Sequence, residues 1–166
     1  MSSKFDDLVR QSIQLGESFP IMPVDEIRLA VAFAELPNID QVVERLVTEL
    51  YDHPNMHVRR IAVNACRRAQ AFTVPSLKAA LTDKLSDSEA WVVYDAAWAI
   101  HSAGYDSPEI RHLLSNIAGV KPLAELQALV AGELGNAHWQ AQARARVTLN
   151  ALIDSNLSSK ASGFLT

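Results

Sequence analysis

The stretch DHPNMHVRRIAVNACRRA, residues 52–69, carries the pattern that decides the fold. Its small apolar residues recur every three or four positions, and four arginines lie between them. Apolar residues at this spacing form one face of an α-helix, whereas those of a half-buried strand alternate. We therefore predict a helix with one apolar face, made of Val58, Ile61, Ala62, Ala65, Cys66 and Ala69.

The pattern recurs along the chain. Residues 52–69 align with residues 87–104 at an offset of 35, and IRLAVA at 27–32 aligns with VRRIAV at an offset of 31. A weaker echo is ARARVT at 143–148. A helix pair that cannot bury its apolar face alone does so by stacking on the next pair. We therefore predict an all-α protein built from stacked antiparallel helix pairs.

Helical spacing continues over most of the chain, and alternating strand patterns are absent from the sequence. We predict about nine helices, near residues 3–17, 24–36, 39–51, 55–70, 74–85, 89–103, 107–118, 122–134 and 137–154. Residues 1–155 would form one domain, and the polar segment 156–166 would be a flexible tail.

Several residues indicate where helices begin and end. The first helical turn tolerates proline, which favours starts at Pro23, Pro54 and Pro108. Ser86 stands three residues before Glu89, the spacing of a capping box. We expect helices to end at Gly104 and at Gly135.

The composition narrows the class of protein. Fifteen Lys and Arg against nineteen Asp and Glu give a net charge of -4, which disfavours a nucleic-acid partner without excluding a local basic patch. A single cysteine, Cys66, excludes an internal disulfide and a multi-cysteine zinc site, and we expect it to be a buried, inert thiol. The N-terminus lacks the apolar core of a signal peptide and no stretch reaches membrane-spanning length, so we expect a cytoplasmic protein without a membrane partner.

The repeats resemble those of the HEAT-repeat family, in which the second helix of a pair carries Val-Arg-x-x-Ala after an aspartate in the turn. Asp52, Val58-Arg59 and Ala62 match this motif, and Asp25 with Ile27-Arg28 matches it more loosely. The third copy departs, since Tyr94 stands where the arginine would be. The resemblance covers residues 20–105 best. It implies a short α-solenoid in which Arg59 pairs with a turn aspartate such as Asp52 or Asp87.

The arginines of residues 52–69 favour a structural role over phosphate binding. Arg60, Arg67 and Arg68 point away from the apolar face, and the last two complement the dipole at the helix end. A phosphate site would need arginines in register on neighbouring second helices, and Arg28 and Arg144 are the candidates.

The helix at 89–103 has an aromatic face. Trp91, Tyr94, Asp95, Trp98 and His101 share it, opposite an apolar face made of Val93, Ala96, Ala97 and Ile100. In HEAT-like stacks second helices line the concave surface, so this face would be a binding hot spot. The alternative is packing between repeats. The aligned partners of Trp91 and Trp98 are apolar, and Asp95 falls over Arg60, with which it would pair.

Trp91-x-x-x-Asp95 also resembles the tryptophan and aspartate of HEAT-like alkylpurine DNA glycosylases. The resemblance implies that Trp91 contacts a damaged nucleotide and that Asp95 stabilises the cationic sugar as the base leaves. Trp139 would be a second aromatic contact. The basic groove of that family is missing from this sequence.

We therefore predict a non-enzymatic scaffold that binds a protein partner through its second helices, without a cofactor. Its binding residues would be Trp91, Tyr94, Asp95, Trp98 and His101, flanked by Arg60 and Arg67. The alternatives are the glycosylase-type enzyme, with Asp95 and Trp91 as its catalytic residues, and a HEAT-like bilin lyase or chaperone. His53 and His57 lack a third ligand, so we expect no metal site. The sequence leaves the oligomeric state open.

Overall fold

The computed structural model describes residues 3–18, 20–119 and 136–164, and within these ranges the chain is all-α. It has eight described helices: α1 Lys4–Gly16, α2 Pro23–Ala34, α3 Ile39–Leu50, α4 Met56–Ala69, α5 Leu77–Lys84, α6 Ala90–Ala103, α7 Pro108–Ala118 and α9 Asn136–Phe164. The helix predicted at 122–134 and the stop at Gly135 lie outside the described residues. The all-α prediction is confirmed for the described part of the chain.

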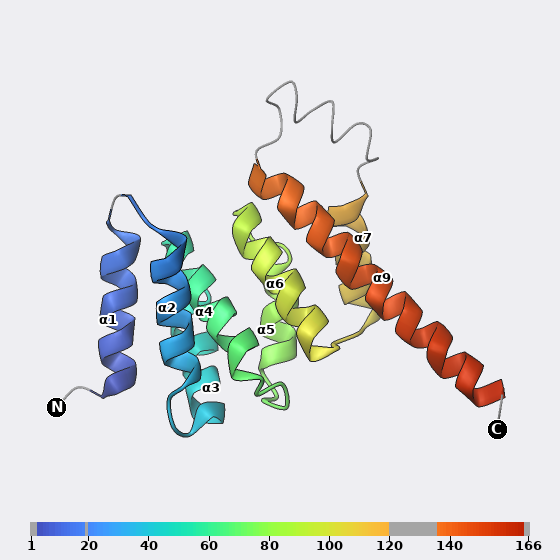
Figure 1. Ribbon diagram of the computed structural model, residues 1–166, viewed down its shortest axis with the longest axis horizontal. Coiled ribbons are helices and arrows are strands. Elements are labelled where there is room, and N and C mark those ends of the chain that lie inside the picture. Colours follow the sequence, from blue (N-terminus) through green and yellow to red (C-terminus); the bar gives the residue numbers. More distant parts are fainter. Residues whose placement is uncertain (1–2, 19, 120–135, 165–166) are drawn as a thin grey trace.

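The helices form two layers. Helices α2, α4, α6 and α9 lie side by side and run in the same direction, and we call this layer the row (Figure 1). In the second layer α3 packs on α4, α5 on α6 and α7 on α9. Helix α1 closes one end of the row, where it contacts α2 and α4. The row carries every residue that we predicted to bind.

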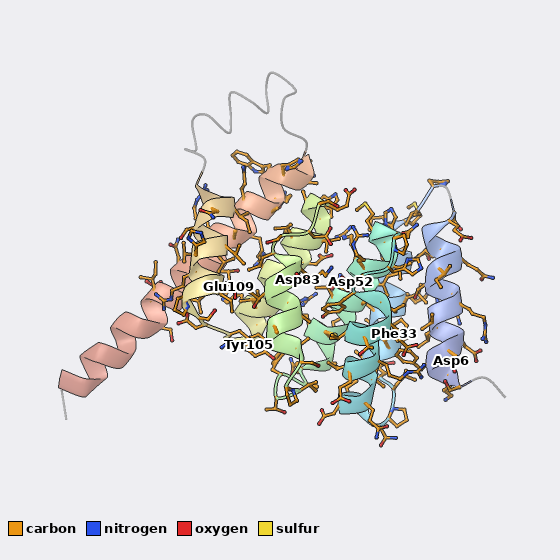
Figure 2. All side chains as sticks on the ribbon, turned by 180° about the vertical axis from the view of Figure 1, so that it is seen from behind. Asp6, Phe33, Asp52, Asp83, Tyr105 and Glu109 are labelled. Carbon is orange, nitrogen blue, oxygen red and sulfur yellow. The ribbon has the colours of Figure 1, made fainter. Side chains whose placement is uncertain are left out.

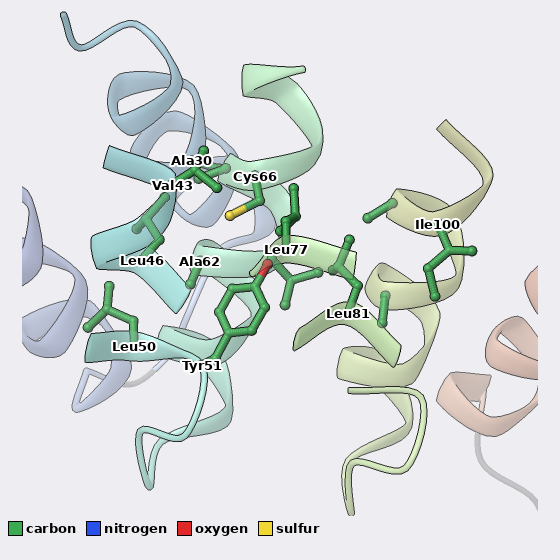
Figure 3. Packing of buried hydrophobic residues seen from close by; sticks show 14 of the residues in the cluster. Ala30, Val43, Leu46, Leu50, Tyr51, Ala62, Cys66, Leu77, Leu81 and Ile100 are labelled. Carbon is green, nitrogen blue, oxygen red and sulfur yellow. The ribbon is translucent and has the colours of Figure 1, made fainter. Parts of the chain in front are cut away.

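The core lies between the two layers. Leu46 and Leu50 of α3 and Leu77 and Leu81 of α5 pack toward the apolar face of α4 (Figure 3). The predicted apolar faces of α4 and α6 are confirmed, because all their residues are buried except Ala69, which is partly buried. Each fully buried leucine stabilises the fold by about 2 kcal/mol, and the alanines let neighbouring helices approach closely.

The ends of the helices correct some boundary predictions. Pro23 and Pro108 occupy first turns as predicted. Pro54 does not, because Asn55 caps α4 by accepting a hydrogen bond from the His57 backbone N–H (2.9 Å). The prediction that Ser86 and Glu89 form a capping box is also wrong. The Asp87 carboxylate accepts the Glu89 N–H instead (2.9 Å), and α6 begins at Ala90.

The start of α5 and the end of α9 lie further from their predicted positions. Helix α5 begins at Leu77, three residues after the predicted start, because Pro75 disfavours helical backbone at the residue before it. Helix α9 continues to Phe164, through most of the segment that we assigned to the tail. Inside the fold, the buried Thr148 hydroxyl of α9 donates a hydrogen bond to the Ala97 carbonyl of α6 (2.9 Å). This bond fixes α9 against its neighbour α6 in the row.

A charged cluster joins the turns between helices. Arg59 donates to both carboxylate oxygens of Asp87, at 3.0 Å each. Of the two turn aspartates that we predicted as its partner, Asp87 is therefore the one that it pairs with. Asp52 pairs with Lys84 instead: Nζ of Lys84 lies 3.0 Å from Oδ1 of Asp52 and 3.8 Å from Oδ2 of Asp83 (Figure 2, where both aspartates are labelled). The cluster ties the α3–α4 turn to the α5–α6 turn.

Candidate interaction surface

A chain of charged side chains crosses three helices of the row. Arg60 of α4 lies between Asp95 of α6 and Glu26 of α2. Its Nε is 2.8 Å from Oδ2 of Asp95, and its Nη1 is 3.4 Å from Oε2 of Glu26. The pairing of Arg60 with Asp95, predicted from the offset of 35, is therefore confirmed. Both carboxylates are buried, with Glu26 6% and Asp95 4% exposed, so each requires the arginine to offset its desolvation.

Both histidines that we weighed as metal ligands have other partners. Nδ1 of His57 lies 2.5 Å from Oε1 of Glu26, and Nδ1 of His53 accepts the Asn55 backbone N–H at 3.1 Å. The described residues contain no group of three or more His, Cys, Asp or Glu side chains placed to hold a metal ion.

The three aromatic residues of α6 contact one another in sequence along the helix. The ring centroids of Trp91 and Tyr94 are 5.4 Å apart, and those of Tyr94 and Trp98 are 5.8 Å apart. Both pairs meet edge to face, the geometry that the ring quadrupoles favour. All three side chains, with His101 one turn further on, are partly buried. The aromatic face is thus neither fully open nor part of the core.

Arginines from the flanking helices cover the aromatic rings. Arg60 of α4 lies over Trp91, with Cζ 4.9 Å from the ring centroid. Arg67 of α4 and Arg144 of α9 both lie over Trp98, at 4.0 Å and 4.4 Å. Such cation–π contacts contribute about 0.5–1 kcal/mol each at exposed sites and more where water is excluded. They hold the rings and the guanidiniums in fixed relative positions.

Asp95 is the most perturbed carboxylate of this surface. Burial raises its pKa from the ordinary 3.8 to about 6, and the hydrogen bond from Arg60 opposes that rise. Asp95 thus remains mostly ionised at neutral pH and is fully engaged with Arg60. A carboxylate that stabilises a substrate cation would have to reach that cation, and this one is covered.

The structure brings together most of the predicted binding residues. Trp91, Tyr94, Asp95 and Trp98 form one connected group with Arg60 and Arg67. His101 shares their face of α6, but its side chain makes no hydrogen bond or ring contact with another described residue. Trp139 lies in the first turn of α9 and stacks on none of the described aromatic rings.

Sequence reasoning missed two members of the group. Glu26 is one, although the offset of 31 aligns it with His57, the residue it contacts, and could have indicated the pair. Arg144 is the other: we considered it only as a phosphate ligand, and it lies on Trp98 and, at 5.6 Å, on Tyr94. Its contact depends on how α9 docks on α6, which no sequence offset predicts.

Comparison of the chain with protein-family models, curated proteins and solved structures finds no match. Among the described helices, none has both the length and the apolar character needed to cross a membrane.

Proposed function

We propose that this protein is a non-enzymatic interaction module with a HEAT-like stack of helix pairs, and that the outer surface of the row binds a partner protein. The observation that carries the proposal is the aromatic group of α6. Three large rings lie at the surface, partly buried, in contact with one another and with arginines of both flanking helices. Aromatic and arginine side chains of this kind dominate the energetics of known interfaces.

Rigidity supports the same function. The edge-to-face contacts and the covering guanidiniums fix the side chains before a partner arrives. Binding therefore loses less side-chain entropy, a cost of about 0.5–1.5 kcal/mol for each side chain that must be immobilised. Trp91, Tyr94 and Trp98 are the anchors of this surface, and Arg60 holds the α4 side of it to α6.

Capture of partner proteins by the immobilised chain tests this function. We expect Trp98→Ala to lose proteins that the wild type retains, while Lys78→Ala, at an exposed position on α5 in the other layer, retains them. Circular dichroism must show that both variants keep the wild-type helix content. Equal capture by the wild type and Trp98→Ala, or loss caused by Lys78→Ala alone, would place binding elsewhere on the molecule.

The glycosylase-type function is the second candidate, favoured by the presence of Trp91 and Asp95 on one face beside Arg60. It requires a carboxylate that reaches the substrate, whereas Asp95 is buried against Arg60. Release of an alkylated base from duplex DNA, abolished in Asp95→Asn, would establish this enzyme activity in place of the interaction module.

A further inference from the structure

Three residues from three helices form a compact unit at the end of the aromatic group, and we call Arg67, Trp98 and Arg144 the arginine–tryptophan cluster. Arg67 approaches from α4 and Arg144 from α9, the two helices on either side of α6 (Figure 1). Both guanidiniums therefore lie within 4.4 Å of the centroid of one indole ring. Two like charges are brought to one place by the fold.

The two arginines of this cluster have no ion-pair partner in the described part of the chain. Arg59 and Arg60 each have a carboxylate partner within 3.0 Å. Among the described residues, no carboxylate forms an ion pair with Arg67 or Arg144, and Arg67 donates only to the Asn64 side-chain amide oxygen (2.9 Å). Burial, followed by the positive charge of Arg68, lowers the pKa of Arg67; the Asp95 carboxylate opposes this shift, and the charge of Arg144 adds to it. The arginines repel one another in the absence of an anion.

The stacked guanidiniums keep their hydrogen-bond donors for a ligand. Cation–π contact uses the face of a guanidinium, whereas its N–H groups donate in the plane, in a fork that matches a carboxylate. Contact with Trp98 therefore leaves N–H groups of both arginines available to a ligand, apart from the Arg67 group that donates to Asn64. An anion that bridges the two would also relieve their repulsion.

The surroundings provide room and an apolar contact. A hollow of about 430 Å³ beside the cluster is lined by Arg67 and Arg68 on one part and by Glu35 on another, so its cationic part lies next to the cluster. On the other side, Val147 lies one turn after Arg144 on α9 and is 48% exposed. A chain that crosses the cluster would meet cationic groups at its centre and an exposed apolar side chain beside them.

We propose that the arginine–tryptophan cluster binds neighbouring carboxylates of an acidic peptide segment in the partner protein. This proposal rests on the function proposed above, in which the row binds a partner protein. The charge distribution favours a peptide over a nucleic acid. Arg60 is neutralised by Asp95 and Glu26, so among the described residues of α4 the cations Arg67 and Arg68, with Arg144 of α9, do not continue through Arg60 as a track for a phosphate backbone. Two arginines already lie over the Trp98 ring, so a nucleic-acid base would have to compete with them to stack there.

The test is fluorescence anisotropy with a labelled peptide that carries four consecutive glutamates between leucines, beside the same peptide with glutamines. We expect the glutamate peptide to bind, the glutamine peptide not to bind, and the affinity to fall with salt. Arg67→Gln and Arg144→Gln should each weaken binding about tenfold, the effect of losing one charge-assisted contact. Arg28→Gln removes the same charge from an exposed position of α2 and should change affinity less than about twofold.

Arg144→Lys is the control for a loss of binding that is caused by misfolding. It keeps the positive charge of residue 144 but loses the planar fork of donors. It should bind more tightly than Arg144→Gln and more weakly than the wild type. Failure of the glutamate peptide to bind, or an equal loss in Arg28→Gln, overturns the proposal. The proposal is also overturned if the protein binds a single-stranded oligothymidylate more tightly than the glutamate peptide and if Arg67→Gln and Arg144→Gln lose that binding.

The capture experiment separates this proposal from the function on which it rests. If Trp98→Ala loses partner proteins while Arg67→Gln and Arg144→Gln retain them, the row surface is an interaction surface and the acidic segment is refuted. If all three variants capture the same proteins as the wild type, the row is not the binding surface, and both the proposed function of the row and the acidic segment are refuted.

Discussion

Arg59 and Asp87 face each other through two parallel nitrogen–oxygen contacts of 3.0 Å, with side chains only 10% and 5% exposed. Arg59 also donates to the backbone carbonyls of His53 and Pro54, at 2.9 Å and 3.2 Å. One guanidinium therefore serves two turns that lie far apart in the sequence. The contact is structural and lies apart from the proposed binding surface.

Removal of Arg59 should destabilise the protein strongly. We expect Arg59→Gln to lower the free energy of unfolding by about 3 kcal/mol, because it leaves the buried Asp87 carboxylate with Lys84 as its remaining cation. Urea denaturation followed by circular dichroism measures the change. Arg68→Gln, at an exposed position, should cost less than about 0.5 kcal/mol. A loss below about 1 kcal/mol for Arg59→Gln would contradict the role assigned to this pair.

Asp95 should make stability fall as pH rises. Its pKa is about 6 in the folded protein and near 3.8 in an unfolded chain, so the folded state binds a proton that the unfolded state lacks between these values. Its favourable contribution is complete below about pH 4 and is lost as pH rises through about 6. Relative to Asp95→Asn, the wild type should lose on the order of 2–3 kcal/mol over this window. Parallel stability curves for the two proteins across this range would refute the shift.

The ends of α4 and α6 offer a matched pair of substitutions. Gln70 and Gly104 both occupy left-handed backbone, with φ of 56° and 70°. Glycine adopts this conformation without the steric cost that a Cβ imposes. We expect Gln70→Gly to stabilise the protein by roughly 0.5–1 kcal/mol and Gly104→Ala to destabilise it by about 1 kcal/mol.

Space plays no part at Gly104, because a Cβ there would meet no heavy atom within 4 Å. Urea denaturation of both variants thus isolates the backbone contribution. Changes of the same sign in the two proteins would show that left-handed strain does not govern these helix ends.

Cys66 should resist thiol reagents in the folded protein. Burial raises its pKa to about 12, so the thiolate that reacts is scarce, and the sulfur lies in the core between the layers (Figure 3). Ellman's reagent should label the native chain only at the rate at which it opens. In denaturant the same thiol should react at once. A native rate that grows in proportion to reagent concentration, without a plateau, would mean that the thiol is accessible.

The repeat pattern predicts much of this structure because its periodicity reflects burial. Every residue that helical spacing assigned to the apolar face of α4 is buried or partly buried, although Val63 is buried as well. The offset of 35 places Arg60 beside Asp95 because aligned residues of stacked helices are neighbours. The same reasoning fails where the repeat is interrupted. Arg144 meets Trp98 only because α9 takes the next position in the row, and the sequence between α7 and α9 shows no such register.

The positions of helix ends are the second feature that the sequence did not predict correctly. Ser86 and Glu89 have the spacing of a capping box, yet the Asp87 carboxylate takes the Glu89 N–H while it also holds Arg59. A local motif therefore yields to a partner that lies 28 residues away in the sequence. Sequence spacing contains no information on that competition.

The two-layer arrangement has a consequence for how the chain folds. Extensive contacts join helices that are close in chain order, such as α2 with α4 and α4 with α6, and the Arg60–Asp95 bond spans only 35 residues. Closing short loops costs little entropy, and proteins dominated by such contacts fold quickly. Each helix pair can add to the one before it as soon as it has been synthesised. The row can therefore assemble from one end, without waiting for the last helix to emerge.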